Sequence, residues 1–462
     1  MNTALDRFRP DTAWRAYYPT GTNPWDVRRV AHLYRRTTGG ATWAQLEAGL
    51  QATPSELAAT LVAGQGATAE ARFNGEMAGV ASRVDTMETL QAYVLHRLIH
   101  SPHPFRERMT LFWHNHFATS NAKIRNVRLM QTQYETLHRH ALGRFDALLQ
   151  DLTFDPAMIV WLDGNANKAG KPNENYAREV MELFSLGVGN YTEKDIQEAA
   201  RALTGWSVEG TQAKFNPAEH DSGEKTIFGQ TGHWTAGDVV RLCLCQPACA
   251  TFIVRKLYRF LVSETAEPSA ALLKPLEDGF RARNYDIAWL AGQMLQSWVF
   301  FSDAAIGQIV KSPVDYATSV MIALEGRPNL RELATLGQTL GQNLFSPPSV
   351  KGWDGGVAWI NSATLLRRQN MAFDVTLGQQ GIYRTDPARL ASRHKLSSDE
   401  ALVTFFLRLF HQMAESTTVQ TIVAQLQAER GSAAFPTDPD ALALNARSAA
   451  HLALVMPEFQ LG

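Results

Sequence analysis

Apolar residues recur at helical spacing along most of this 462-residue chain, and this periodicity constrains the fold more than any other feature. They stand three and four positions apart in Val30, Leu33 and Tyr34, and the segment 142–152 repeats the spacing. Residues spaced in this way share one face of an α-helix. The sequence therefore predicts a chain of about 20 helices, each of which buries one apolar stripe.

Helix starts are marked by a hydroxyl side chain followed by a proline. Thr53 precedes Pro54, and Ser312 precedes Pro313. The hydroxyl can accept a hydrogen bond from a backbone amide of the first turn, and proline suits the first helical position because no amide is needed there. Asp315 stands where its carboxylate could reach back to the Ser312 amide. These pairs predict helices that begin at positions 54 and 313.

Two stretches interrupt the helical pattern. Residues 207–234 are rich in glycine, threonine and charge, which predicts a long loop or a small β-hairpin between helices. Residues 343–361 contain Pro-Pro, Gly-Trp and Gly-Gly pairs, which are incompatible with a continuous helix or strand. The sequence thus predicts an all-α protein, an orthogonal or bundle-like array of helices, with a small irregular or β-hairpin insert near residues 207–234.

The length of the chain exceeds what one small core usually serves, so we expect more than one packed region. An N-terminal extension is expected over residues 1–24. The main helical domain, with the insert inside it, is expected over residues 25–380. A C-terminal helical region over residues 381–462 is expected to pack on the same body.

Charge is nearly balanced, with 44 lysines and arginines against 45 aspartates and glutamates and a net charge of -1. With no basic stripe between aromatic residues, this balance argues against nucleic-acid binding. No apolar run reaches the roughly 18 residues that span a membrane, so we expect no transmembrane segment. The first residues show no apolar signal region, which favours the cytoplasm.

The first polar cluster contains His114 and His116, at the expected end of a helix. Two residues apart, they diverge whether the backbone is helical or extended. A neutral imidazole can act as a metal ligand or as a general base, so either histidine is a candidate catalytic residue. The alternative is a helix end at which one histidine is packed in the core and hydrogen bonded.

The second cluster is the helix expected to follow residue 173. Glu179 and Glu182 are three residues apart, so both carboxylates can face one site, either to split their pKa values for acid–base work or to hold a cation. Arg178 can pair with a glutamate one turn away, and Arg178 and Asn175 are candidates for binding an anionic substrate. The alternative is an ordinary solvated helix.

The third cluster lies in the insert, where His220, Asp221 and Lys225 stand beside glycines in an expected loop. A histidine, a carboxylate and an amine on a loop held by rigid helices form a plausible catalytic or anion-binding set. Trp353, in the irregular segment 343–361, is a further candidate for contact with a substrate. The alternative for the insert is a polar turn.

If these clusters meet in space, they form one polar cleft. The candidate catalytic residues would then be His114, His116, Glu179, Glu182, His220 and Asp221. A divalent metal could be held by Glu179, Glu182 and His220 and activate water, or the same carboxylates and imidazoles could work as a metal-free acid–base pair.

Six motifs occur in order along the chain: FWHNHF, NENYAREVMELFSLGVGNYTEKDIQEAARALTGW, HDSGEKTIFG, FIVRKLYRFLV, KSPVDY and PPSVKGWDGG-x-x-WINS. Together they closely resemble the bacterial family known as domain of unknown function 1800, from about residue 25 to residue 371 and onward. The motifs of the resemblance coincide with the polar clusters described above. The resemblance itself implies no particular reaction.

Genes of that family often neighbour genes of a sulfatase-like family, domain of unknown function 1501, whose members can carry export signals. The resemblance therefore implies a working partnership and an envelope location reached through the partner.

Two hypotheses about function follow. One is an enzyme with a His/Glu/Asp cleft that performs metal-assisted or acid–base hydrolysis. The other is a non-catalytic partner or maturation factor of the sulfatase-like protein, with the segment Trp353–Trp359 as a docking surface. An open pocket lined by the polar residues favours the enzyme, and their pairing inside a closed core favours the partner.

Overall fold

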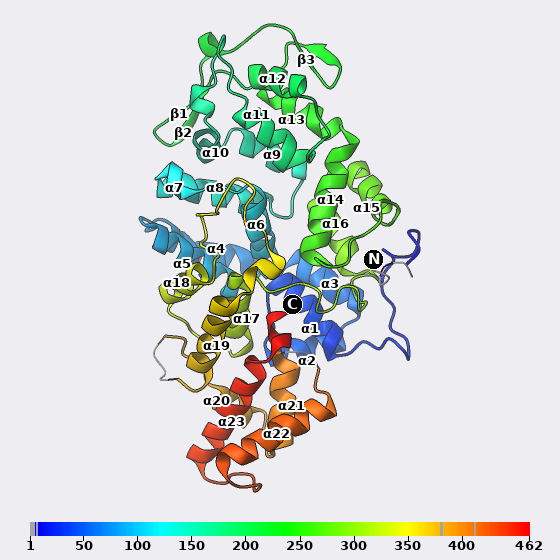
Figure 1. The fold of residues 1–462 in the computed structure, drawn as a ribbon, viewed down its shortest axis with the longest axis vertical. Coiled ribbons are helices and arrows are strands. Elements are labelled where there is room, and N and C mark those ends of the chain that lie inside the picture. Colours follow the sequence, from blue (N-terminus) through cyan, green and yellow to red (C-terminus); the bar gives the residue numbers. More distant parts are fainter. Residues whose placement is uncertain (1–4, 6–7, 379–381, 411–412) are drawn as a thin grey trace.

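Helices dominate the computed structural model, which describes residue 5 and residues 8–378, 382–410 and 413–462. Helices account for 61% of the residues and strands for 5%, so the predicted all-α class is confirmed. Figure 1 shows helices at the centre of the molecule and at both of its ends. The buried apolar side chains form one continuous core that runs through these helices.

The part of the chain before the insert forms helices with short connections. They are α1 (Val27–Thr38), α2 (Trp43–Gln51), α3 (Pro54–Ala63), α4 (Ala67–Ala81), α5 (Met87–His100), α6 (Pro104–His116), α7 (Asn121–Ile124), α8 (Val127–His140), α9 (Phe145–Thr153), α10 (Pro156–Trp161), the 3-10 helix η1 (Gly164–Ala166), α11 (Asn175–Glu179), the π-helix η2 (Val180–Ser185) and α12 (Glu193–Ala202).

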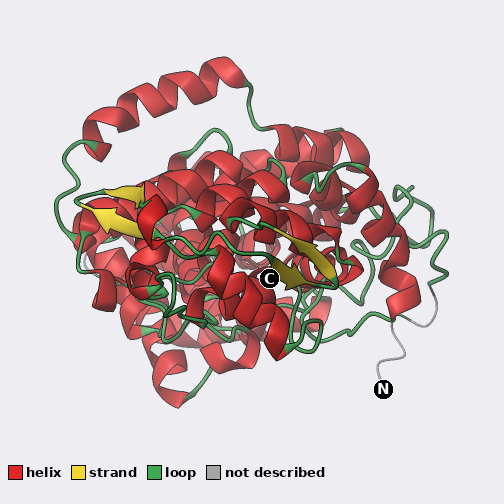
Figure 2. Cartoon of the chain, turned by 90° about the horizontal axis from the view of Figure 1, so that it is seen from above, coloured by secondary structure: helices red, strands yellow, loops and turns green. Residues whose placement is uncertain are grey.

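The insert contains two small antiparallel hairpins, which confirms the interruption predicted near residues 207–234. Strand β1 (Trp206–Glu209) pairs with β2 (Gln212–Phe215), and β3 (Lys225–Ile227) pairs with β4 (Gln230–Gly232). The short 3-10 helix η3 (Pro217–Glu219) lies between them. Figure 2 shows the two pairs of strands apart from each other, so they do not join into one sheet.

The chain after the insert returns to helices. They are α13 (Ala236–Cys245), α14 (Pro247–Leu261), α15 (Ala270–Ala282), α16 (Ile287–Leu295), α17 (Pro313–Ala323), α18 (Leu330–Thr339), the 3-10 helix η4 (Gly356–Trp359), α19 (Ser362–Thr376), α20 (Pro387–Arg393), α21 (Asp399–Phe410), α22 (Ser416–Arg430), α23 (Pro439–Leu454) and the 3-10 helix η5 (Pro457–Gln460).

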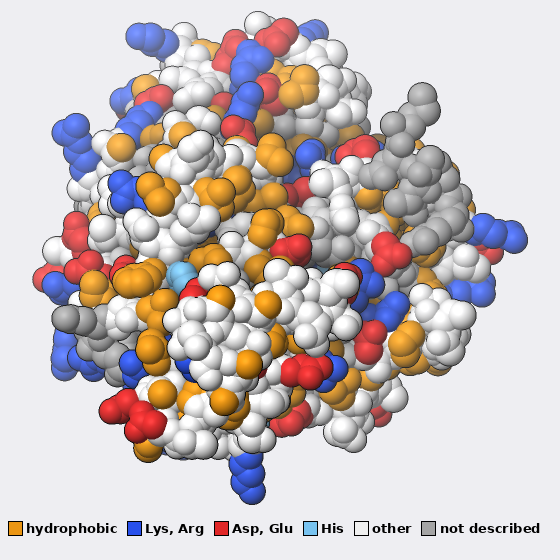
Figure 3. Space-filling view, turned by 60° about the horizontal axis from the view of Figure 1, so that its bottom comes forward, with side chains coloured by type: hydrophobic (Ala, Val, Ile, Leu, Met, Phe, Trp, Pro, Cys, Tyr) orange, Lys and Arg blue, Asp and Glu red, His pale blue; other side chains and the backbone are white. Residues whose placement is uncertain are grey.

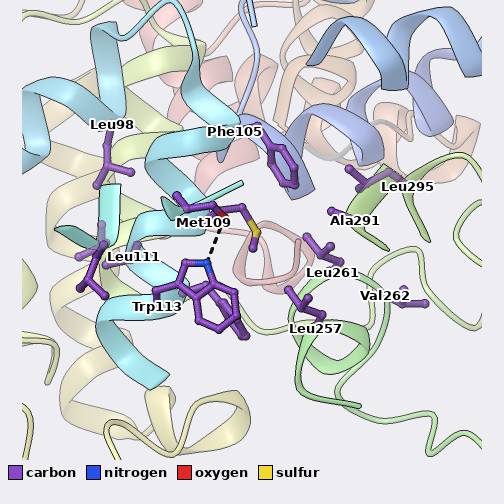
Figure 4. Packing of buried hydrophobic residues seen from close by; sticks show 14 of the residues in the cluster. Leu98, Phe105, Met109, Leu111, Trp113, Leu257, Leu261, Val262, Ala291 and Leu295 are labelled. Atoms are coloured by element: carbon purple, nitrogen blue, oxygen red, sulfur yellow. Dashed lines mark hydrogen bonds between the residues drawn. The ribbon is translucent and has the colours of Figure 1, made fainter. Parts of the chain in front are cut away.

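Helices α6 and α14 carry the centre of the core. Figure 4 shows Met109 and Trp113 of α6 opposite Leu257 and Leu261 of α14. All four side chains are fully buried. The Trp113 indole donates a hydrogen bond of 3.0 Å to the Ala141 carbonyl, so its polar atom is satisfied inside the core. This packing fixes α6 and α14 relative to each other, and the polar side chains at the end of α6 inherit that rigidity.

The predicted helix starts are confirmed, with one correction. Thr53 and Ser312 cap α3 and α17, and the Ser312 hydroxyl accepts a hydrogen bond of 3.1 Å from the Asp315 amide. The Asp315 carboxylate does not turn back to the Ser312 amide, as the sequence suggested, but pairs with Arg108. Arg108 is 6% exposed, and a buried guanidinium needs a carboxylate more than an amide does.

Within the described residues, no single helix is long and apolar enough to cross a membrane. Helices α13 and α14 pass the same length and composition criteria only as a pair, and they are bent by 79° at their junction.

Candidate functional site

Helix α6 ends at the two predicted histidines, and the first of them faces the irregular segment 343–361. His114 is 2% exposed, and its Nε2 atom accepts a hydrogen bond of 3.0 Å from the Phe345 amide. Its ring packs against Phe345 and Trp353, with centroid distances of 4.7 and 5.7 Å. Burial lowers the pKa of His114 to about 4, so the ring is neutral near neutral pH. His114 therefore fastens the irregular segment to α6.

Asn115 strengthens this attachment. Its Oδ1 atom accepts a hydrogen bond of 2.8 Å from the Trp353 amide, and its Nδ2 atom donates one of 3.4 Å to the Trp353 carbonyl. Gly352 has a φ of +82°, and a Cβ atom there would overlap the side-chain and backbone oxygens of Asn115. Glycine is therefore required at this close approach. Trp353, which the sequence predicted to contact a substrate, is 7% exposed and is part of this attachment.

His116 faces the opposite side, where η2 and α14 meet. Its Nε2 atom lies 3.0 Å from the Phe184 carbonyl, and its Nδ1 atom lies 3.0 Å from the Lys256 amine. The carbonyl can only accept, so Nε2 carries the proton and Nδ1 accepts from Lys256. Burial, and then the Lys256 charge, hold the pKa of His116 well below its usual range. The Phe184 carbonyl is available to His116 because it lies in the last turn of the π-helix, where carbonyls lack partners within the helix.

Lys256 is the functional candidate that the sequence did not single out. Its amine also lies 3.5 Å from the Leu183 carbonyl and 4.7 Å from the centre of the Phe252 ring. Burial lowers the pKa of Lys256 to about 8. Within the described chain, no carboxylate forms an ion pair with it. The available signal was a lysine between Phe252 and Phe260 in an apolar helix. His114, Asn115, His116, Trp353 and Lys256 are called the α6 junction below.

Glu179 and Glu182 lie at the passage from α11 to η2. Burial, and then the neighbouring Glu182 charge, raise the pKa of Glu179, while Arg178 and Lys351 oppose the shift. Glu182 accepts a hydrogen bond of 2.6 Å from the Tyr191 hydroxyl. The two carboxylates are therefore close enough to interact, as their spacing suggested, and Lys351 of the irregular segment lies near them.

Arg178 and Asn175, the predicted anion-binding pair, both have partners inside the chain. Arg178 pairs with Glu174 at 3.2 Å and with Glu193 at 2.7 Å. The Asn175 amide group donates a hydrogen bond of 3.2 Å to Asp163. Pairing of Arg178 with a glutamate one turn away was expected, whereas Glu193 is brought in by the start of α12.

The insert residues form a separate group, called the insert cluster below: His220, Asp221, Lys225 and Arg201 of α12. Asp221 accepts two hydrogen bonds from Arg201, of 2.7 and 3.1 Å. The Lys225 amine is buried and donates to the carbonyls of Asp221 and Gly223, at 2.5 and 2.9 Å. The His220 Nδ1 atom lies 3.0 Å from the carbonyl of Thr204, shortly after the end of α12. The cluster thus folds the insert onto α12.

Two more carboxylates of α12 hold the second hairpin. Glu198 accepts a hydrogen bond of 3.0 Å from the Thr226 amide, and Asp195 accepts one of 2.7 Å from the Phe228 amide. Strand β3 has a backbone edge that needs acceptors, and these side chains supply them. The acidic residues of α12 therefore serve as attachment points for the insert.

The contacts of the predicted residues fall into two sets. The α6 junction joins the end of α6, η2, α14 and the segment 343–361, whereas the insert cluster is assembled on α12. The partner of His220 in this second set is Thr204. Among the residues that the structure describes, no group of three or more His, Cys, Asp or Glu side chains could hold a metal ion.

Four cavities lined by residues that the structure describes lie away from the predicted site residues. They are found beside α1 and α21, between α5 and α18, beneath α4, and next to α2. None of these four is lined by a residue predicted for the site. The polar side chains chosen from the sequence are thus used mainly to hold irregular segments against helices.

These features define a helical protein in which two irregular segments are attached by buried polar side chains. A family model described as "Protein of unknown function (DUF1800)" matches residues 32–461, nearly the whole chain. The chain belongs to this family, which confirms the resemblance of its six motifs. No curated protein matches the chain, and no solved structure does.

Proposed function

We propose that this protein acts by binding another protein, and that its partner is a sulfatase-like protein encoded beside it. The proposal rests on one observation. The imidazoles, carboxylates and amines that an enzyme of the expected kind would need are mostly engaged in contacts within the chain. A catalytic group must reach a substrate atom, whereas these groups reach backbone atoms of their own fold.

The histidines illustrate this best. His114 accepts from the Phe345 amide and His116 donates to the Phe184 carbonyl. Both residues are at most 4% exposed. The Asp221 carboxylate is held by two nitrogens of Arg201, Nε and an Nη. Such pairing supports a rigid scaffold, because buried polar groups that have partners stabilise one arrangement of segments.

A partner needs an exposed surface, and helix α19 offers one. Leu366 and Phe373 are 58% and 50% exposed, and they lie two turns apart on the same side of α19. Val357, shortly before α19, is 82% exposed. The tryptophans of the predicted docking segment are buried, so Val357 is what that segment contributes. Figure 3 shows exposed hydrophobic side chains between charged ones on the end of the molecule that faces the viewer. Exposed apolar side chains on one face are typical of protein contacts.

Co-expression of this chain with the sulfatase-like protein, followed by size-exclusion chromatography, tests the proposal. We expect the two proteins to elute together. The double substitution Leu366→Asp and Phe373→Asp should weaken the complex at least tenfold, because it places two charges in an apolar contact. Val188→Asp is the matched control, since Val188 is 76% exposed on another part of the chain. Separate elution of the two folded wild-type proteins would contradict the proposal.

One observation favours a catalytic alternative: the Lys256 amine lies 3.0 Å from the His116 ring, with no ion pair among the described residues, and burial lowers its pKa to about 8. A neutral amine can attack a carbonyl carbon, and the resulting carbinolamine loses water to give an imine. Acetaldehyde with cyanoborohydride, read by peptide mass spectrometry near neutral pH, tests this reactivity. Lys256 should be ethylated at least tenfold faster than the exposed Lys351, and equal rates would exclude an activated amine.

A further inference from the structure

A cavity of about 260 Å³ lies between α4, α5 and the start of α18. Its wall is mainly apolar and is formed by Met77, Val80, Val84, Ala92, Tyr93 and Leu330. The size is slightly below that of typical small-molecule sites, which span roughly 300 to 1,000 Å³. An apolar cavity of this size suits a short acyl chain or a single ring.

The lining of the cavity also includes two arginines and a histidine. Arg83 and Arg331 belong to its lining, and both residues are exposed. Neither guanidinium forms an ion pair within the described part of the chain. Deeper in the wall, the Nδ1 atom of His96 is buried without a hydrogen-bond partner among the described residues. Asp85, close to Arg83 in sequence, accepts a hydrogen bond of 3.4 Å from Thr89.

We propose that this cavity binds a small amphiphilic anion, with its acyl chain or ring on the apolar wall and its carboxylate between Arg83 and Arg331. A guanidinium pairs with a carboxylate through two parallel hydrogen bonds, and two arginines at the mouth of an apolar cavity favour an anionic head group. This inference is independent of the proposed partner, because the cavity lies on α4 and α5 and not on α19.

The two halves of helix α4 are held unequally over this cavity. Its first half is anchored: Glu70 pairs with Arg106, Phe73 stacks on His96 at 6.0 Å, and Asn74 accepts a hydrogen bond of 3.1 Å from Arg97. Its second half is held at the last residue, where the Gln131 amide group donates a hydrogen bond of 3.1 Å to the Ala81 carbonyl.

Met77 is the only buried residue of α4, and a Cβ atom added at Gly75 or Gly79 would meet no other atom within 4 Å. Glycine inside a helix is less favourable than alanine. The part of α4 that covers the cavity is therefore a weak helix, and local opening can admit a ligand.

Isothermal titration calorimetry with sodium octanoate, an anion of about ten non-hydrogen atoms, tests the proposal. The wild-type chain should bind one octanoate with a sub-millimolar Kd. Arg83→Gln together with Arg331→Gln should weaken binding at least tenfold. Arg72→Gln is the matched control on α4, because the Arg72 side chain is 84% exposed and pairs with Glu76. It should leave the Kd unchanged.

Two further titrations separate the apolar wall from the charged mouth. Ala92→Phe, which fills the cavity, should abolish binding while circular dichroism shows an unchanged helical content. The neutral alcohol 1-octanol should bind at least tenfold more weakly than octanoate. Equal binding of 1-octanol, equal binding by the double arginine variant, or no heat from octanoate with wild-type protein would each overturn the proposal.

Discussion

The insert cluster and the α6 junction both place a histidine and a lysine in buried or half-buried surroundings, but they balance the lysine charge differently. In the insert cluster, Asp221 lies beside Lys225 and forms a two-bond ion pair with Arg201. At the α6 junction, the Lys256 amine contacts the His116 ring, and no carboxylate of the described chain pairs with it. Burial lowers the pKa of both lysines, but the Asp221 charge opposes the shift at Lys225, whereas no such charge opposes it at Lys256.

Both regions nevertheless solve the same structural problem. Each attaches an irregular segment, whose backbone groups cannot pair within a helix or a sheet, to the side of a rigid helix. Buried backbone amides and carbonyls need partners, and side chains of α6, α12 and α14 supply them. This need accounts for much of the density of polar residues in the family motifs. Lys256 is one polar group whose position attachment alone does not explain.

The largest effect is expected from breaking the α6 junction at its closest approach. Gly352→Ala would place a Cβ against Asn115 at a φ of +82°, so we expect a loss of roughly 4 kcal/mol in the free energy of unfolding. Gly210→Ala in the insert is the control, because Gly210 has a φ of +62° and open space around it. It should cost about 1 kcal/mol. Urea unfolding followed by circular dichroism measures both, and equal losses would refute the tight contact with Asn115.

The next prediction concerns the charge of Lys256 and the way it makes the free energy of unfolding depend on pH. The pKa of Lys256 is about 8 in the fold against an ordinary value of 10.5. Below the folded value the folded state bears the full cost of the buried charge. Between the two values the folded state has released the proton and the unfolded state has not, so stability rises with pH.

Lys256→Met removes this dependence. The stability of the wild type relative to Lys256→Met should therefore rise by up to roughly 3 kcal/mol between about pH 7 and pH 10, since one pKa unit corresponds to about 1.4 kcal/mol. Parallel urea titrations of both proteins at several pH values give this difference. A difference that stays flat over that range would show that Lys256 is not held with a lowered pKa.

In the insert cluster, replacing the carboxylate should lower stability, because Arg201 loses the two hydrogen bonds to Asp221 and keeps its pair with Glu198. Asp221→Ala should lower the free energy of unfolding by roughly 2 kcal/mol, since the Arg201 and Asp221 side chains are 28% and 22% exposed. Glu219→Ala is the control: its pair with Lys168 is more exposed, at 33% and 51%, and should be worth within about 0.5 kcal/mol. Similar losses in both variants would show that the insert cluster is an ordinary surface pair.

The fold was predictable because its signals are local. Helical spacing, the Thr53 and Ser312 caps, and the glycine-rich interruption each act within a few residues, and the structure confirms all of them. The meeting of segments was not predictable in the same way. His114 and Phe345 are 231 residues apart in sequence, and His116 and Phe184 are 68 apart. No local pattern specifies which carbonyl or amide a histidine will reach.

Charged residues show the same limit. The pairing of Arg178 with Glu174 follows from helical spacing, but its second partner, Glu193, depends on where α12 begins. The sequence suggested that the Asp315 carboxylate accepts from the nearby Ser312 amide. In the structure it pairs with Arg108, a buried cation 207 residues away in sequence. The sequence therefore identified three clusters of polar side chains. It could not show whether those clusters lie close together in the fold.

The smallest expected loss of stability is that of one helix cap, and the other losses can be compared with it. Ser312 lies outside both clusters, and its hydroxyl caps α17 through the Asp315 amide at 3.1 Å. Ser312→Ala should cost about 1 kcal/mol, the usual value of a helix cap, and Ser312→Thr should cost less than half of that because it keeps the hydroxyl. Urea unfolding at one pH measures both variants. If Asp221→Ala costs no more than Ser312→Ala, the insert cluster stabilises the fold no more than one cap does, and the contrast with the α6 junction rests on the Lys256 charge alone.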